Sequence, residues 1–275
     1  MNAHPPFPTQ PFMAPWTPLL RLFKGLPRKG PGSEASTLRA LSLCPLPARP
    51  RAADFGCGSG AATLVLAREL QAPILALDAD GTALDDLYGS ARDRGLLHLV
   101  RPRPGDMASP GLETGSLDLL WSEGAVAHLG LEAAFRVWTA LLAPGGVMAF
   151  TDATWFDPDP PEEARRAWAQ WYPTMGTEAG NLRIAREAGL RVLGHFRLPS
   201  QDWWDYYDGV AARFPSFAED EGLAPVIAAQ RAEMDLYRRT GSSYGYVFYV
   251  LRKPQEPSRA RPGPAPSSAA RTRSC

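Results

Sequence analysis

A glycine-rich segment early in the chain joins a short apolar stretch to a run of helix-forming residues. It reads Ala53-Asp54-Phe55-Gly56-Cys57-Gly58-Ser59-Gly60, and the helix-forming run covers residues 61–70. Glycines at such a junction let the backbone turn sharply and come close to a ligand. Gly56, Gly58 and Ala61 also satisfy the dinucleotide-binding pattern G-x-G-x-x-G/A, so the glycines alone do not identify the ligand.

Three acidic residues near the glycines help to identify the kind of ligand that the glycine-rich segment binds. Asp54 stands two residues before Gly56, where a carboxylate can face the ammonium group of an amino-acid ligand. Asp78, followed by Ala79, ends the next apolar run and can accept hydrogen bonds from both hydroxyls of a ribose. In Gly105-Asp106-Met107, the carboxylate can accept from an adenine amino group and the methionine can flank the ring. Asp106 alone is also typical of a turn and Asp54 of a helix cap, but the acids in this order and spacing favour a binding site.

The elements that position these residues follow from the hydrophobic pattern. Apolar runs at 51–55, 73–77, 98–101, 117–121 and 147–150 predict strands, and 61–70, 82–94 and 131–142 predict helices between them. This alternation predicts an α/β fold with a doubly wound, mainly parallel sheet. Beyond residue 152, helices are expected at 162–172, 178–188 and 223–239 and strands at 191–198 and 244–251, while 201–214 is rich in aromatic residues.

Composition limits the class of protein. The 275 residues are 45% hydrophobic, and no apolar run approaches the length of a membrane span. Three scattered cysteines, Cys44, Cys57 and Cys275, favour neither a disulfide framework nor a zinc site. Without residues 253–275 the chain keeps 24 basic and 28 acidic residues. This slightly negative balance is unfavourable for binding the phosphate backbone of a nucleic acid. We expect a cytoplasmic protein without a metal, a membrane span or a nucleic-acid partner, as a monomer or homodimer.

The domain organisation is predicted from the same hydrophobic pattern and composition. Residues 1–18 would be a flexible N-terminus, 19–252 a single domain, and 253–275 a disordered basic tail. Segments 19–44, 153–190 and 199–240 would form a helical, aromatic lid over the sheet.

The motifs resemble those of class I S-adenosylmethionine-dependent methyltransferases. Residues 54–60 are similar to their first motif, Asp78 to their ribose-binding acid, and Gly105-Asp106-Met107 to their adenine loop. A narrower likeness, over about residues 20–253, is to bacterial small-molecule methyltransferases related to the quinone-pathway enzymes. Its residues are Phe23-Lys24-Gly25, Gly30-Pro31-Gly32-Ser33, Ser122-Glu123-Gly124-Ala125, Gly130, Trp155, Tyr172-Pro173, Asn181, Ala188-Gly189 and Tyr244-Gly245-Tyr246.

The resemblance implies a seven-stranded Rossmann-like sheet of order 3-2-1-4-5-7-6, with the antiparallel last strand at 244–251. It implies S-adenosylmethionine as the cofactor, with Ser122 and Glu123 facing its methionine end. The expected cofactor-binding residues are Asp54, Gly56, Cys57, Gly58, Gly60, Asp78, Ala79, Gly105, Asp106, Met107, Ser122 and Glu123. For Cys57, a small residue that fills space is the better interpretation than a nucleophile.

Methyl transfer to a small molecule is the function we expect. A sulfonium is an activated methyl donor, so catalysis is mainly alignment, and a base is needed only when the acceptor must lose a proton. Candidates for that base are His128, Glu123 and Tyr172; His128 stands where the resembling group often has Asn, and it also fits a packing role. Ser33, His128, Trp155 and Tyr172 would contact a flat or apolar acceptor.

The alternatives are a non-catalytic S-adenosylmethionine-binding protein and a nicotinamide-dependent oxidoreductase. The segment before the first sheet strand also has two interpretations. Ser33 is the expected N-cap of a helix that, in the resembling enzymes, folds over the cofactor. Alternatively, the segment only packs on the flank of the sheet.

Overall fold

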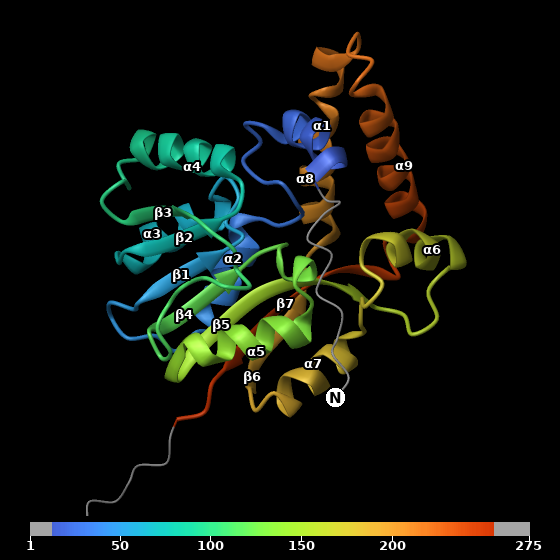
Figure 1. The fold of residues 1–275 in the computed structure, drawn as a ribbon. Helices are drawn as coiled ribbons and strands as arrows, with labels where there is room; N and C mark the ends of the chain where they lie inside the picture. Colours follow the sequence, from blue (N-terminus) through green and yellow to red (C-terminus); the bar gives the residue numbers. More distant parts are fainter. Residues whose placement is uncertain (1–12, 256–275) are drawn as a thin grey trace, which may run out of the picture.

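One seven-stranded sheet organises the molecule (Figure 1). The structure, a computed structural model, describes the backbone of residues 13–255 and the side chains of 18–255. The strand order is β3-β2-β1-β4-β5-β7-β6, and β7 is antiparallel to both of its neighbours, as predicted. The strands are β1 (Ala52–Phe55), β2 (Ile74–Asp78), β3 (Val100–Pro104), β4 (Leu117–Ser122), β5 (Leu142–Trp155), β6 (Arg191–Arg197) and β7 (Tyr244–Arg252).

Helices cover both faces of the sheet and bury its apolar side chains. On one face lie α2 (Glu34–Ser42), α3 (Ala61–Leu70) and α4 (Gly81–Asp93); on the other lie α5 (Leu131–Leu141) and α7 (Glu178–Glu187). Because both faces are covered, the inner strands are apolar on both sides, and β1 is buried along its whole length. This double burial is the reason that the inner strands β1, β2 and β4 appear in the sequence as mostly apolar runs.

A third layer stands over the carboxyl ends of the strands. It contains α1 (Met13–Phe23), α6 (Glu162–Trp171), α8 (Ser200–Ala211) and α9 (Ala224–Thr240), with the short 3-10 helices η1 (Val126–His128) and η2 (Phe214–Phe217) (Figure 1). Its core is largely aromatic and includes Phe23, Tyr172, Trp203, Tyr207, Tyr237 and Tyr244. We call this layer the lid.

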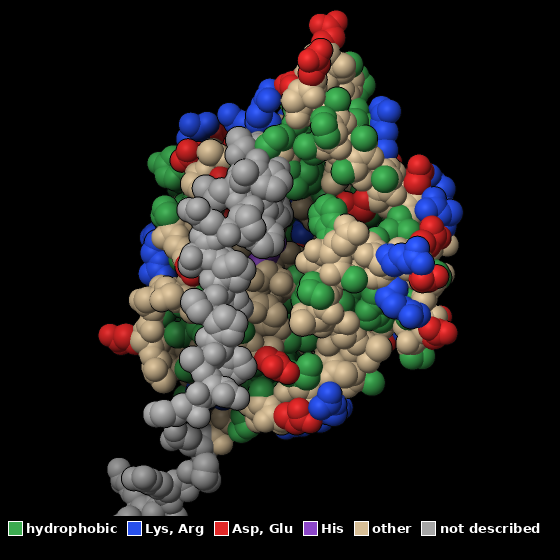
Figure 2. All heavy atoms as spheres, turned by 45° about the vertical axis from the view of Figure 1, so that its right-hand side comes forward, with side chains coloured by type: hydrophobic (Ala, Val, Ile, Leu, Met, Phe, Trp, Pro, Cys, Tyr) green, Lys and Arg blue, Asp and Glu red, His purple; other side chains and the backbone are tan. Residues whose placement is uncertain are grey.

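The outer surface of the lid carries charges of both signs (Figure 2). Ion pairs join Glu162 to Arg166 along α6, and Arg239 of α9 to Glu163 of α6 at 2.9 Å. Such exposed pairs contribute little to stability, but they keep the outer face of the lid polar. No helix in the described part of the chain has the length and apolarity needed to cross a membrane.

The structure corrects several predicted boundaries. β5 extends well beyond 147–150 at both ends: Leu142 pairs with Leu117 of β4, and β7 pairs with β5 from Val147 to Trp155. Helix α1 begins at Met13, so the flexible N-terminus predicted for 1–18 overlaps a helix. Lys253 donates to the carbonyls of Thr139 and Leu142 at 3.0 and 2.7 Å, so it is anchored rather than part of a tail. The rest of those two predicted segments, 1–12 and 256–275, lies outside the described residues.

Candidate functional site

The glycines of the loop between β1 and α3 adopt backbone conformations with positive φ, which favour glycine. Gly56 has φ +66°, and a Cβ there would lie 2.3 Å from the Cβ of Ala125. By contrast, a Cβ on Gly58 would meet nothing within 4 Å, so one side of the loop is open to an approaching ligand. Cys57 between them is buried, and burial raises the pKa of its thiol, which fits a packing residue.

Asp54 lies beneath this loop as an incompletely paired acid. Its side chain is only 1% exposed, and its Oδ2 accepts a hydrogen bond from Thr63 Oγ1 at 2.6 Å. Oδ1 is buried and has no partner among the described residues. Burial raises the pKa of this carboxyl to about 8. A positively charged group that donates hydrogen bonds, such as an ammonium, complements this site.

Asp78 is fixed at the carboxyl end of β2 by two backbone donors. Gly58 N donates to its Oδ2 at 2.7 Å, and Asp80 N donates to its Oδ1 at 2.9 Å. Each carboxylate oxygen keeps a further lone pair, which a ribose hydroxyl can use. Lys29 forms an ion pair with Asp80 at 3.0 Å, and Ala79 is exposed beside them. The segment before the first sheet strand, residues 19–44, which we call the N-terminal segment, therefore reaches the rim of the predicted ribose site through Lys29.

Asp106 and Met107 lie where the third parallel strand ends. Asp106 is exposed and accepts a hydrogen bond from Ala108 N at 2.8 Å, which is the turn-stabilising contact that the sequence also allowed. Met107 Sδ lies 3.9 Å from the position that a Cβ on Gly56 would take. A Cβ on Gly105 would lie 2.7 Å from Leu77 Cδ1, which explains the glycine. The structure thus brings this loop beside the glycine loop.

Glu123 after β4 is engaged by three donors. They are Arg28 at 2.6 Å, Thr37 Oγ1 at 2.7 Å and Trp121 Nε1 at 2.9 Å, and the glutamate side chain is 9% exposed. This geometry argues against the base role that the sequence suggested for Glu123. The residue instead ties the N-terminal segment to the sheet. Its neighbour Ser122 is fully buried, and Ser122 Oγ has no partner among the described residues.

The N-terminal segment also binds the lid helix α8. Ser33 accepts from Ser36 N at 3.1 Å, so its predicted N-cap role is confirmed and its hydroxyl serves helix α2. Ser36 Oγ donates to Asp202 Oδ2 at 2.6 Å, and Gly32 N donates to Asp202 O at 3.4 Å. These contacts place the segment between the end of β4 and the start of α8. They support the lid interpretation for the part of the segment before Ser33, whereas α2 itself packs on one face of the sheet, as the flank interpretation expects.

The remaining predicted acceptor residues surround the end of β5. Tyr172, buried where α6 ends, donates from its hydroxyl to Asp152 Oδ2 at 3.1 Å. Trp155 packs its ring edge-on to Tyr244 with centroids 5.8 Å apart. His128 ends η1 with an exposed side chain, and partial desolvation lowers the pKa of its imidazole. These residues lie in or beside the lid.

Asp152 is the residue that sequence reasoning missed. It is 1% exposed, and burial raises the pKa of its carboxyl to about 8. The sequence places Asp152 two residues after the strand predicted at 147–150, and therefore outside the sheet, whereas Asp78 directly follows its predicted strand. In the structure Asp152 lies within β5.

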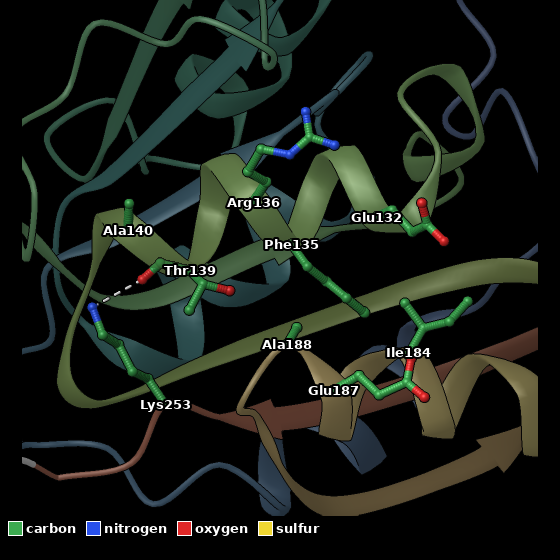
Figure 3. A pocket seen from close by; sticks show the side chains of 9 residues that line it. All are labelled: Glu132, Phe135, Arg136, Thr139, Ala140, Ile184, Glu187, Ala188 and Lys253. Carbon is green, nitrogen blue, oxygen red and sulfur yellow. Dashed lines mark hydrogen bonds between the residues drawn. The ribbon is translucent and has the colours of Figure 1, made fainter. Parts of the chain in front are cut away.

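A separate hollow lies between α5 and α7, away from the carboxyl ends of the strands (Figure 3). It measures about 510 Å³. Its lining is Glu132, Phe135, Arg136, Thr139, Ala140, Ile184, Glu187, Ala188 and Lys253. None of the predicted site residues is among them, so this hollow does not belong to the candidate site.

Sequence comparisons agree with the fold. A family model described as a methyltransferase domain matches residues 52–146. The dimethylglycine N-methyltransferase of Parasynechococcus marenigrum (strain WH8102) is 31% identical over 109 residues, which cover 39% of each chain. The biotin biosynthesis bifunctional protein BioCD of Bordetella avium (strain 197N) is 29% identical over 237 residues, 81% of this chain and 48% of that one. The chain thus spans less than half the length of these curated relatives.

A solved structure extends the likeness to nearly the whole chain. The S-adenosylmethionine-dependent methyltransferase of Thiobacillus denitrificans, in complex with S-adenosyl-L-homocysteine, matches with a TM-score of 0.74 at 19% identity. The match covers 85% of this chain and 96% of that one. The chain has the fold of the class I methyltransferases.

Proposed function

We propose that this protein transfers a methyl group from S-adenosylmethionine to a small-molecule acceptor. The observation that carries the proposal is Asp54: a buried carboxyl with one unpaired oxygen, directly beneath a loop that is open at Gly58. An amino-acid ammonium complements that oxygen. Asp78, fixed by the same loop, suits a ribose. Together these acids fit the two ends of a nucleoside joined to an amino acid, and the methyltransferase-domain match over residues 52–146 supports the proposal.

Different residues around the glycine loop bind different parts of that cofactor. Asp54 receives the ammonium, Asp78 the ribose hydroxyls, and Asp106 with Met107 the adenine. The bound cofactor supplies an activated methyl group. The backbone at Gly56, Cys57, Gly58, Gly60, Ala79 and Gly105 lines the path between these acids, and Ser122 lies toward the methionine end.

Positioning and exclusion of water are the chain's main catalytic contributions. Arg28, Thr37 and Glu123 lock the N-terminal segment over the end of β4, so the lid can exclude water from the acceptor. Where the acceptor must lose a proton, His128 is the better of the earlier candidates. Its pKa lies below the usual range, so it is neutral near pH 7. Burial raises the pKa of Tyr172, which makes this phenol a hydrogen-bond donor rather than a base.

The acceptor side of the site is aromatic. Trp155 and Tyr172 lie in or against the lid core with Trp168 and Tyr244, and these rings suit a flat or apolar molecule. We include in the proposal a closer relation to the small-molecule methyltransferases of the quinone-pathway type. It rests on the motif from Ser122 to Ala125 and on Trp155 and Tyr172.

Calorimetric titration with S-adenosylhomocysteine and, separately, with NADH tests the proposal. We expect the first to bind and the second not to bind, because the unpaired oxygen of Asp54 fits an ammonium group, which NADH lacks. Binding of NADH alone would refute the proposal. Binding of S-adenosylhomocysteine without methyl transfer to any member of a broad acceptor panel would identify a non-catalytic binding protein instead.

A further inference from the structure

Two buried oxygens without partners among the described residues lie on neighbouring strands near the carboxyl edge of the sheet. Asp152 of β5 is 1% exposed; its Oδ2 accepts from Tyr172, while Oδ1 has no partner among the described residues. Ser122 of β4 is 0% exposed, and its Oγ is likewise unpartnered within the described chain. An unsatisfied buried polar group costs about 1–3 kcal/mol, so such groups call for an explanation.

The strand register places both oxygens on one face. Ser122 is paired with Phe150 in the β4–β5 ladder, and Asp152 lies two residues further along β5. Side chains two residues apart point to the same face, and the step is about 7 Å. Thr151 Oγ1 accepts a hydrogen bond from Gly124 N at 2.7 Å, so the end of β5 is tied to the loop that follows Ser122. Asp152 therefore lies beside the expected methionine end of the cofactor.

No positive charge faces Asp152 from the described elements around it. The titratable groups near it are phenols: Tyr172 from the end of α6, and Tyr246 and Tyr249 from β7. None of the ion pairs in the described chain includes Asp152, although burying a carboxylate without a counter-charge is costly. The missing counter-charge is one that a ligand can bring.

We propose that Asp152 Oδ1 and Ser122 Oγ receive the amino group of the methyl acceptor, so that the acceptor is an amine. This inference rests on the proposed function and names its substrate class. Two unpartnered oxygens on the same face of neighbouring strands can both accept from a nitrogen that carries several hydrogens and lies between them. Trp155 and Tyr172 then contact the carbon skeleton of the amine, and the hydroxyl of Tyr172 holds the other oxygen of Asp152 in place.

The amine arrives as an ammonium, and the proton on Asp152 leaves to solvent as the ion pair forms. One N–H proton then passes to Asp152 Oδ1, which frees the nitrogen lone pair. That lone pair forms the new bond to the methyl carbon, and the electrons of the broken C–S bond stay on sulfur. The acceptor leaves as the methylated ammonium, Asp152 keeps the proton that it accepted, and the second product is S-adenosylhomocysteine.

Calorimetry with S-adenosylhomocysteine already bound tests the inference. The probes are benzylamine, 2-phenylethylamine, tryptamine and hexylamine, each paired with the alcohol of the same skeleton, at pH 7 in buffers of different ionisation enthalpy. We expect at least one amine to bind more tightly than its alcohol and to release close to one proton, because a carboxyl of pKa about 8 is mostly protonated at pH 7. Asp152→Asn should weaken amine binding at least tenfold, abolish the proton release and leave alcohol binding unchanged.

Controls separate this inference from folding and from the proposed function. Asp152→Asn keeps the size of the side chain and an acceptor for Tyr172, and we expect its affinity for S-adenosylhomocysteine to stay within threefold of wild type. Tyr172→Phe removes a hydrogen bond that lowers the pKa of Asp152, so proton release should persist to higher pH; Tyr249→Phe, which removes a buried hydroxyl bonded to Thr154 and Asn181, should not change it.

Each failure has its own meaning. If wild type does not bind S-adenosylhomocysteine, the proposed function fails. If it binds S-adenosylhomocysteine but no amine binds more tightly than its alcohol, the amine inference alone is overturned. Proton release that survives in Asp152→Asn overturns it equally.

Discussion

Cofactor affinity should depend steeply on pH through Asp54. In the ligand-free protein, burial raises the pKa of this carboxyl to about 8, so below that pH it is mostly neutral. An ammonium ligand needs the ionised form, because Oδ1 must become an ion-pair partner. Binding of S-adenosylhomocysteine below pH 8 must therefore release the proton of Asp54.

The size of the effect follows from the ionised fraction. For a pKa of about 8, roughly half of Asp54 is ionised at pH 8 and about 1% at pH 6. Affinity for S-adenosylhomocysteine should fall about 50-fold between these pH values, or about 2.3 kcal/mol. Below pH 6 the fall continues at about tenfold per pH unit.

Calorimetry across pH 6 to 9, repeated in two buffers of different ionisation enthalpy, measures both affinity and proton release. Asp54→Asn should bind more weakly at pH 8 than wild type, with an affinity that hardly changes between pH 6 and 8. Thr63→Val, which removes the donor to Oδ2, should move the pH dependence upward, because that hydrogen bond lowers the pKa of Asp54. A wild-type affinity that is flat across this range, with no proton released, would refute the role of Asp54.

Three further outcomes are expected. Asp78→Ala should weaken S-adenosylhomocysteine by about 1.5–3 kcal/mol, since two hydroxyl hydrogen bonds to a charge are lost, and Asp106→Ala should weaken it less; an equal loss in calorimetry would mean that the adenine is misplaced. Arg28→Ala should lower the free energy of unfolding by on the order of 2 kcal/mol in denaturant titrations, and far less in a Glu123→Gln background, because the carboxylate that it pairs is mostly buried. The buried Asp152 favours the folded state most below about pH 4 and loses that contribution as pH rises toward 8, so Asp152→Asn should gain stability relative to wild type by on the order of 1 kcal/mol per pH unit between pH 5 and 8; equal melting curves at all pH values would contradict this.

The sheet could be predicted because its inner strands are buried on both faces. In β1, β2 and β4 this burial leaves mostly apolar runs, and Asp54 and Asp78 stand just before or at the ends of β1 and β2. The extent of β5 could not be predicted in the same way. Thr151, Asp152 and Thr154 interrupt the apolar pattern, and the strand continues there because β7 supplies the backbone hydrogen bonds.

The parts of the site that depend on local sequence could be predicted. The contacts that depend on residues distant in the sequence could not. The positive φ of Gly56 and the cap at Ser33 are local, and both were visible as motifs. Two of the three hydrogen bonds to Glu123 come from Arg28 and Thr37, which are far away in the sequence, so the residues near Glu123 do not indicate them. The pairing of Asp152 with Tyr172 was hidden for the same reason.

The position of β7 ties the order of synthesis to the completion of the sheet. β6 pairs only with β7 in the described structure, so Arg191–Arg197 has no partner until Tyr244–Arg252 has left the ribosome. At about 5–20 residues per second, that wait lasts on the order of seconds, during which β5 and β6 both present open strand edges. A nonsense mutation before residue 244 would therefore remove more than one strand: it would detach β6, leave β5 without its antiparallel neighbour, and yield a product for chaperones and proteases rather than a smaller enzyme.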